Sequence, residues 1–214
     1  MARSRRLALY SHAFNFDAVT IDTRGELTFA LNSDYTLRDM PKNIEIKAAL
    51  NNVGAARNTA IRLSGGNPDV LHQEDVFFRC EAARLKLRIF GPHSGELIRY
   101  QRSNVPAARV SQYLIARTHD PEILRNILTE TLGVIGVVKK TRELFLIGQT
   151  RIHIDDVDGL GDFLELEVVM RPGQKESEGQ EIVRDLLSEF CIGQDQLLGD
   201  AYIDVLRRRQ GLAI

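Results

Sequence analysis

Two glutamates lie two residues apart in the apolar stretch GDFLELEVVM, at residues 161–170. Side chains two apart along a β-strand point to the same face, so Glu165 and Glu167 share one face while Leu164 and Leu166 lie on the other. An antiparallel sheet with one side in water gives the same alternation. The alternative is a face that holds something positively charged.

The same alternation recurs in the other segments that read as strands. NIEIKAAL (43–50) places Glu45 beside Lys47, and ARLKLRIF (83–90) places Lys86 beside Arg88. Further charged residues that share a strand face in this way are Arg102, Lys140, Arg142, Arg151 and Asp155. Lys and Glu are poor strand formers, so their place at strand centres counts against a plain solvated face.

Turn residues separate eight such segments, which predicts an antiparallel β architecture. The segments are 43–50, 73–80, 83–90, 95–103, 109–118, 137–148, 150–157 and 162–170. We expect GPHSG to be a hairpin loop whose glycines adopt positive φ, and GQ and DGLG to form further tight turns. Helices are predicted at 55–64, 120–132, 176–191 and 195–209 from apolar spacing and capping residues.

Closing the eight strands into a barrel, with the helices packed outside, would bring the ionic faces together inside. Buried charges without partners cost several kcal/mol each, and a polyanion with a divalent cation would offset that cost. On physical grounds two interpretations remain open, a charged cavity and a solvated face.

The composition limits the classes of partner. The chain has 214 residues, with 28 Lys and Arg against 29 Asp and Glu, which gives no electrostatic reason to expect nucleic acid or an anionic membrane. It has no apolar run of the roughly 18 residues that span a bilayer. Cys80 and Cys191 form no C-x-x-C motif, which fits a reducing compartment, and we expect the cytoplasm.

The first 41 residues differ in pattern from the rest. MARSRRLALY is basic, as in a mitochondrial presequence, but we favour an extra strand pair or a loose extension. An edge strand there would support a homodimer. The second segment, 42–210, is predicted to be the main domain.

Several motifs resemble, in order, the pattern of the CYTH superfamily, the triphosphate tunnel metalloenzymes. They are NIEIK, RLKLR, LIRYQR, VVKKTR, TRIHIDDVDGLGDFLELEVV and YIDVL, between about residues 43 and 206. The family includes class IV adenylyl cyclases and thiamine triphosphatases, and this chain looks closer to the cyclase branch. The resemblance implies an α+β fold, a closed antiparallel eight-stranded β-barrel with helices outside. It also implies a Mg²⁺- or Mn²⁺-dependent enzyme that acts on a small-molecule triphosphate.

The resemblance assigns roles to residues at matching positions. The implied metal ligands are Glu45, Asp155, Glu165 and Glu167. The implied triphosphate contacts are Lys47, Lys86, Arg88, Arg102, Lys140, Arg142 and Arg151. Catalytic roles fall to Lys47, Arg142 and Asp155, and Tyr202 lies on a C-terminal helix that covers one tunnel mouth in relatives. The first glutamate of the motif E-x-E-x-K is Asn43 here, which weakens a full two-metal chemistry.

Three functions remain open at this stage. Water attack on the γ-phosphorus would make the protein a phosphohydrolase, and attack by a ribose 3′-hydroxyl on the α-phosphorus would make it an adenylyl cyclase. Asn43 motivates the third hypothesis, a nucleotide or polyphosphate binding module without turnover. His153 shares the ionic face and is either a phosphate contact or a structural histidine. Ser111 and Tyr113 share a strand face and would line the tunnel.

Overall fold

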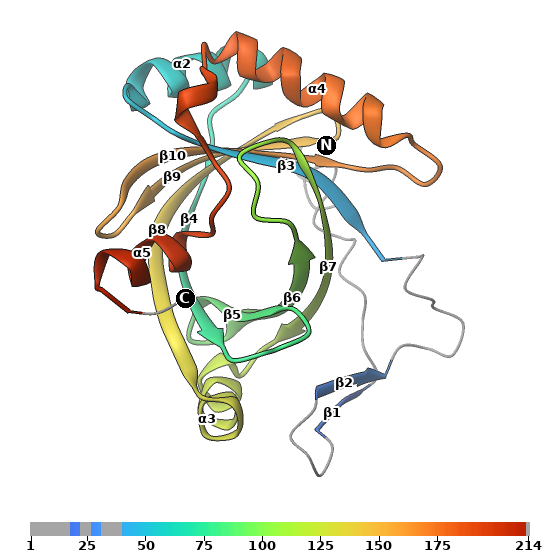
Figure 1. Ribbon diagram of the computed structural model, residues 1–214, viewed down its shortest axis with the longest axis vertical. Coiled ribbons are helices and arrows are strands. Elements are labelled where there is room, and N and C mark those ends of the chain that lie inside the picture. Colours follow the sequence, from blue (N-terminus) through green and yellow to red (C-terminus); the bar gives the residue numbers. More distant parts are fainter. Residues whose placement is uncertain (1–17, 22–26, 31–39, 213–214) are drawn as a thin grey trace. The chain divides into compact units, whose positions relative to one another are not determined.

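The computed structural model describes residues 18–21, 27–30 and 40–212, and its main feature is an antiparallel sheet of long strands (Figure 1). The strands are β3 (Lys42–Ala49), β4 (Asp69–Phe78), β5 (Arg84–Gly91), β6 (Ser94–Arg102), β7 (Arg109–Thr118), β8 (Val134–Ile147), β9 (Thr150–Val157) and β10 (Gly161–Val169). Their hydrogen-bonded order is β10-β9-β8-β4-β5-β6-β7-β3, and β10 also pairs with β3. This last pairing closes the expected eight-stranded β-barrel.

Four α-helices accompany the strands in the described residues: α2 (Val53–Ser64), α3 (Pro121–Leu132), α4 (Glu176–Glu189) and α5 (Tyr202–Arg209). The side chain of Asn52 accepts a hydrogen bond from the Ala55 N–H and so caps the start of α2. Gly65 ends α2 in the left-handed region, with φ of 69°. The helices expected at 55–64, 120–132 and 176–191 are confirmed.

The helix expected at 195–209 is wrong over its first half. A short 3₁₀ turn (Gln194–Gln196) and the two-residue strand β11 (Leu197–Leu198) come first, and the α-helix begins only at Tyr202. β11 pairs with the end of β3, so its backbone belongs to the sheet and does not form a helix. Gly199 follows and lies close to the segment after β6. A side chain would not fit there, because an added Cβ would lie 2.9 Å from the Asn104 carbonyl oxygen.

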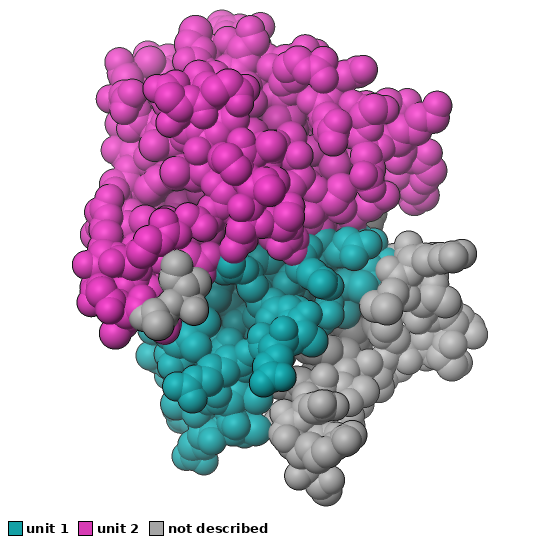
Figure 2. Space-filling view, in the orientation of Figure 1, with its two compact units in different colours: residues 1–41, 75–101, 112–137 teal, residues 42–74, 102–111, 138–214 magenta. Residues whose placement is uncertain are grey.

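The chain divides into two compact units, coloured separately in Figure 2. The first unit comprises residues 1–41, 75–101 and 112–137. The second unit comprises residues 42–74, 102–111 and 138–214.

The core of the second unit joins strands β3, β8, β9 and β10 to helices α2 and α4, which lie together over these strands (Figure 1). Ile44, Ile152 and Leu166 are fully buried in it, and burial of such a side chain contributes about 1.5–3 kcal/mol. Gly179 lets α4 approach β3 closely, since a Cβ there would lie 2.7 Å from Ile44 Cγ1. With the apolar side chains facing the helices, the alternate side chains of each strand point to the inner face of the barrel wall.

The first unit has its own core, in which α3 packs on β4, β5 and β6 around Leu128. The GPHSG hairpin lies here, but the expectation for its glycines is wrong, because neither Gly91 nor Gly95 has a positive φ. Gly95 is needed for space instead: a Cβ would lie 2.9 Å from Pro121 Cβ at the start of α3. The turns at 148–149 and 158–161 are confirmed, with Gly148 at φ 55° and Gly159 at 74°.

The N-terminal segment contains two short strands, β1 (Ala18–Ile21) and β2 (Leu27–Ala30), which pair antiparallel with each other. Most of residues 1–39 lie outside the described part of the chain, so a separate extension up to residue 41 stays a prediction. Among the described residues, every helix is too short or too polar to cross a membrane.

Candidate active site on the ionic face of β3, β8, β9 and β10

The strand register places the predicted site residues of β3, β8, β9 and β10 on one continuous face. Residues directly opposite each other on antiparallel strands share a face. The opposed pairs are Lys47–Glu165, Glu45–Glu167, His153–Glu165, Arg151–Glu167 and Arg142–Asp155. The face therefore runs unbroken across β3, β10, β9 and β8. It also sets two carboxylates, Glu45 and Glu167, directly opposite each other, which is unfavourable unless a positive charge compensates them.

This face is buried, which contradicts the solvated-face interpretation. Lys47 and Arg142 are each 4% exposed, and Asp155 is completely buried. Charges in such a place have to be paired or hydrogen-bonded, because the desolvation penalty is several kcal/mol for each ion. The contacts below show how the chain meets this requirement.

Asp155 on β9 is the most completely satisfied carboxylate of the face. Arg142 donates to it from Nε and Nη2, both at 2.6 Å, and the Tyr202 hydroxyl donates to Oδ2 at 3.0 Å. Burial opposes ionisation of Asp155, but Arg142 outweighs it and holds the pKa of this carboxyl well below its ordinary value. Asp155 thus orients Arg142 and fastens the first residue of α5 to the face.

Lys47 on β3 lies between a carboxylate and an aromatic ring. Its Nζ donates to Glu165 Oε1 at 3.0 Å and sits 3.6 Å from the centre of the Tyr202 ring. Glu165 Oε2 also accepts from Arg142 Nη2 at 2.6 Å. Burial opposes ionisation of Glu165, yet Lys47 and its other polar neighbours hold its pKa well below the usual range. The Tyr202 ring in turn packs on Phe163, with ring centres 4.9 Å apart.

Glu45, the carboxylate that remains of the N-terminal motif, is held by two arginines. Its Oε1 lies 3.0 Å from Arg102 Nε and 3.4 Å from Arg109 Nη2. Burial and the nearby Glu165 raise the pKa of Glu45 in spite of these cations. Arg102 and Arg109 also donate to the Gly199 and Leu198 carbonyls, so they tie Glu45 to the segment that leads into α5.

Arg109 is a residue of this face that was absent from the predicted set. It is 4% exposed, and its Nε has no hydrogen-bond partner among the described residues. Burial and the neighbouring Arg102 lower its pKa. The sequence held the signal, because Arg109 alternates with Ser111 and Tyr113, which were expected to line the site, and both are also buried.

His153 faces two carboxylates from the centre of β9. Its Nδ1 lies 3.8 Å from Glu165 Oε2 and 3.9 Å from Glu167 Oε1, and one ligand atom from each of the three residues falls within 4.8 Å of the others. Burial and Arg142 lower the pKa of the imidazole, which favours its neutral form. Glu167 Oε2 contacts Arg151 at 3.5 Å.

A smaller ionic cluster occupies the first unit. Lys86 Nζ donates to Asp75 Oδ2 at 2.8 Å, and Arg88 Nε donates to Asp75 Oδ1 at 2.8 Å. Asp75 was missed, although the alternation of QEDVFFRC places it on a face with Gln73 and Phe77. That Lys86 and Arg88 act together with the residues of the second unit stays a prediction.

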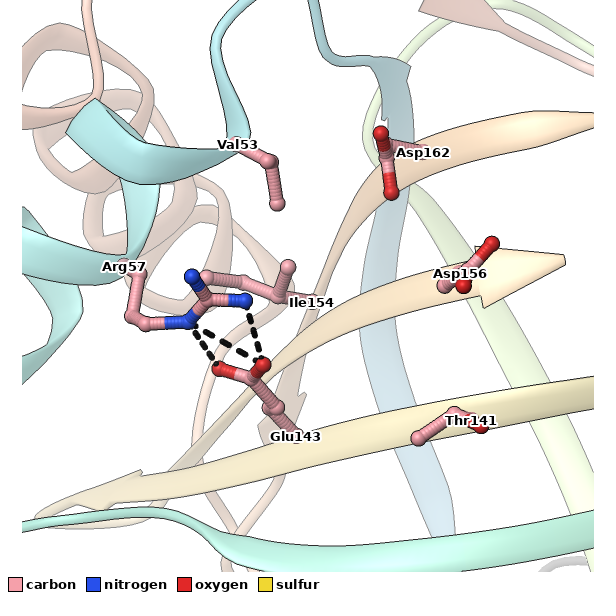
Figure 3. Close-up of a pocket in the computed structure, with 7 residues that line it drawn as sticks. All are labelled: Val53, Arg57, Thr141, Glu143, Ile154, Asp156 and Asp162. Atoms are coloured by element: carbon pink, nitrogen blue, oxygen red, sulfur yellow. Dashed lines mark hydrogen bonds and ion pairs between the residues drawn. The ribbon is translucent and has the colours of Figure 1, made fainter.

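A pocket of about 320 Å³ lies on the other face of β8, β9 and β10, beside α2 (Figure 3). Arg57 from α2 reaches Glu143 with three hydrogen bonds of 2.6–3.1 Å, while Asp156 and Asp162 lie farther along the strands. The charged residues that the strands contribute, Glu143, Asp156 and Asp162, alternate with the ionic face in strand register. None of the predicted site residues lines it.

The ionic face of the second unit carries more positive than negative charge. Its basic side chains are Lys47, Arg102, Arg109, Lys140, Arg142 and Arg151, against the four carboxylates Glu45, Asp155, Glu165 and Glu167. The structure therefore brings together all the predicted site residues of this unit. A surplus of buried cations is a setting in which an anion with several oxygens would be stabilised.

Comparisons with known proteins identify relatives in sequence and in fold. Residues 41–198 match the sequence model of the CYTH domain. A Methanocaldococcus jannaschii protein named "Putative adenylate cyclase" is 25% identical over 141 residues, which cover 62% of this chain and 80% of that protein.

Solved structures with the same fold come from several organisms. PH1012 of Pyrococcus horikoshii has a TM-score of 0.67 at 22% identity, covering 76% of this chain and 98% of that one. A Vibrio parahaemolyticus protein described as a putative adenylate cyclase has a TM-score of 0.64 at 19% identity, covering 77% and 97%. The Hippeastrum protein HpAC1, described as having a dominant triphosphatase activity, has a TM-score of 0.55 at 15% identity, covering 82% and 98%.

Proposed function

Because this chain belongs to the CYTH domain family, we propose that it is a divalent-metal-dependent triphosphatase that hydrolyses the terminal phosphoanhydride bond of a small triphosphate. The observation that carries the proposal is the buried ionic face, on which six basic side chains outnumber four carboxylates. A triphosphate carries about four negative charges near neutral pH, and Arg and Lys side chains stabilise such charge as it shifts during phosphoryl transfer.

The proposed reaction is an in-line displacement. A water oxygen forms a bond to the γ-phosphorus and releases a proton to the solvent, while the bond from the γ-phosphorus to the β,γ-bridging oxygen breaks and the diphosphate leaves with its electron pair. Lys47 and Arg142 are the groups we assign to this charge, since both are buried and both donate to Glu165. Arg102, Arg109, Lys140 and Arg151 would bind the other phosphate oxygens, and Lys86 and Arg88 of the first unit are proposed to contribute as well.

The donor set fits a divalent cation. Glu165 and Glu167 offer carboxylate oxygens side by side on β10, which are the ligands that Mg²⁺ and Mn²⁺ prefer. When bound, the cation supplies a Lewis acid that draws electron density from phosphate oxygens. Glu45 and Asp155, the other two expected ligands, are held by arginines, and we assign to them the positioning of Arg102, Arg109 and Arg142.

A second candidate is an adenylyl cyclase, favoured by the names of the Methanocaldococcus and Vibrio relatives. We prefer hydrolysis because the charged groups of the face would bind the phosphate chain of a substrate. This binding does not require a nucleoside. The neighbour HpAC1, itself called an adenylyl cyclase, is described as mainly a triphosphatase.

The test is product identification by ³¹P NMR with Mg²⁺ or Mn²⁺. Tripolyphosphate contains no hydroxyl that could cyclise, so its conversion to diphosphate and phosphate isolates hydrolysis. With ATP, release of orthophosphate supports the triphosphatase, whereas pyrophosphate with cyclic AMP would replace it by the cyclase. Binding of both compounds without any product would indicate a binding module without turnover.

A further inference from the structure

We propose that one divalent cation binds at His153, Glu165 and Glu167 with the imidazole Nδ1 as a direct ligand, and that Asn43 limits the chain to this single cation. The proposal deepens the proposed function, because it names the cation ligands of that same face. It concerns two residues, a histidine and an asparagine, that the carboxylate motif alone does not explain.

The first observation is the position of the imidazole. His153 is 3% exposed, and its Nδ1 has no hydrogen-bond partner among the described residues. It points at Glu165 Oε2 and Glu167 Oε1 from 3.8 and 3.9 Å, which is too far for hydrogen bonds. A buried polar atom without a partner is costly, so a ligand between these three groups would remove a real penalty.

The second observation is the size of the gap. Ligands about 2.1 Å from a cation are about 3 Å apart on neighbouring octahedral positions and about 4.2 Å apart on opposite ones. The observed separations of 3.8 and 3.9 Å lie between these values. Small side-chain rotations would therefore bring all three atoms into a coordination shell. Glu165 Oε2 can keep its hydrogen bond from Arg142, since a carboxylate oxygen has two lone pairs.

The third observation concerns the other two carboxylates. Asp155 is saturated by Arg142 and Tyr202, and Glu45 is paired with Arg102 and Arg109. Asp155 therefore has a donor beside each of its oxygens, and Glu45 Oε1 has two arginines beside it. Glu165 and Glu167 are the carboxylates that lie beside the imidazole Nδ1.

Asn43 is the fourth observation. It lies two residues before Glu45 on the same face of β3, is 4% exposed, and its Oδ1 has no hydrogen-bond partner among the described residues. A carboxylate at this position would add a negative charge beside Glu45 and diagonal to Glu167, where a second cation could bind. The neutral amide lacks that charge, so the chain retains one cation site.

The experiment measures Mn²⁺ binding to the full chain without any triphosphate. Titration followed by electron paramagnetic resonance of free Mn²⁺ should give one ion per chain. Pulsed spectroscopy of the bound ion should show coupling to an imidazole nitrogen. This signature needs no variant, so it tests the ligand even if substitutions at His153 impair folding. An all-oxygen coordination shell, or no bound Mn²⁺, would overturn the proposal.

Three variants sharpen the test. Changes around a metal site already alter affinity about 10- to 100-fold, so His153→Ala should weaken Mn²⁺ binding at least about tenfold. His72→Ala is the matched control, because this exposed histidine contacts Thr141 on another strand, and it should leave binding unchanged. Asn43→Glu should raise the stoichiometry from one Mn²⁺ to two, and a value that stays at one refutes the role of Asn43.

The outcome is separable from that of the proposed function. A protein that binds one Mn²⁺ through nitrogen but converts no triphosphate would refute the triphosphatase and leave the cation site standing. A protein that hydrolyses tripolyphosphate but binds Mn²⁺ through oxygen atoms alone would support the triphosphatase and refute the histidine ligand.

Discussion

The hydrogen bond from Tyr202 to Asp155 provides a sharp test of how the C-terminal helix is held. Tyr202→Phe removes the hydroxyl, whose oxygen lies 3.0 Å from Asp155 Oδ2, and keeps the ring that packs on Phe163 and Lys47. Hydrogen bonds to charged groups contribute about 1.5–3 kcal/mol. We expect the lower part of this range, about 1.5–2 kcal/mol, because Arg142 still satisfies Asp155 with two bonds of 2.6 Å.

Urea unfolding at pH 7 measures this loss as a lower midpoint at unchanged slope, and the melting temperature should fall by about 3–8 °C for a chain of this size. Tyr202→Leu should lose more, because it also removes the ring beside Lys47. In an Asp155→Asn background the effect of Tyr202→Phe should shrink, since the two changes remove the same bond. An unchanged midpoint for Tyr202→Phe, or an equal loss in both backgrounds, would refute the reasoning.

The pH dependence of the same bond follows from the low pKa of Asp155. Burial alone would raise this pKa, but Arg142 lowers it well below the ordinary value near 3.9. A carboxyl whose folded pKa is depressed contributes stability above its unfolded pKa and loses it only as the pH falls through the folded pKa. The difference in unfolding free energy between wild type and Tyr202→Phe should therefore be equal at pH 7 and pH 5.

Three further predictions concern ligand binding and the N-terminal segment. Glu165→Gln and Glu167→Gln should each abolish metal-dependent hydrolysis while circular dichroism shows an intact fold, and full activity in either would remove the metal assignment. Tripolyphosphate with Mg²⁺ at a hundredfold excess over Kd should stabilise the protein by about 2.7 kcal/mol, with a much smaller effect from monophosphate. Lys140→Met, which keeps the apolar stem of a buried basic residue, should reduce this stabilisation. Equal stabilisation of the wild-type protein by tripolyphosphate and by monophosphate would contradict a triphosphate site. A chain that starts at Met40 should remain folded and bind triphosphate, because the CYTH match begins at residue 41; an insoluble product would assign the earlier residues to the folded domain.

The strands and their faces could be predicted because their signals are local. Alternation of Ile44, Glu45 and Ile46 identifies both faces of β3 without any knowledge of its partners. Gly148 and Gly159 mark the turns through their own backbone preference. For such features a short stretch of sequence contains the whole physical cause.

Features that depend on distant partners could not be predicted in this way. β11 has a composition compatible with a helix, but its hydrogen bonds go to β3, so the helix begins only at Tyr202. Gly95 is required by the approach of Pro121 and not by its own φ. The residues that hold Asp155 are likewise contributed by a neighbouring strand and by the C-terminal helix.

The closing pair of the barrel, β3 with β10, has a consequence for biosynthesis. Lys47 and its partner Glu165 are 118 positions apart, so the lysine leaves the ribosome long before its counter-charge exists. At a synthesis rate of about 5–20 residues per second, this interval lasts about 6–24 s. During that time the edge of β3 that pairs with β10 has no partner, and pairing between segments so distant is intrinsically slow to form. The nascent chain therefore presents an unpaired strand edge during this interval, a condition that makes incompletely folded chains prone to aggregation.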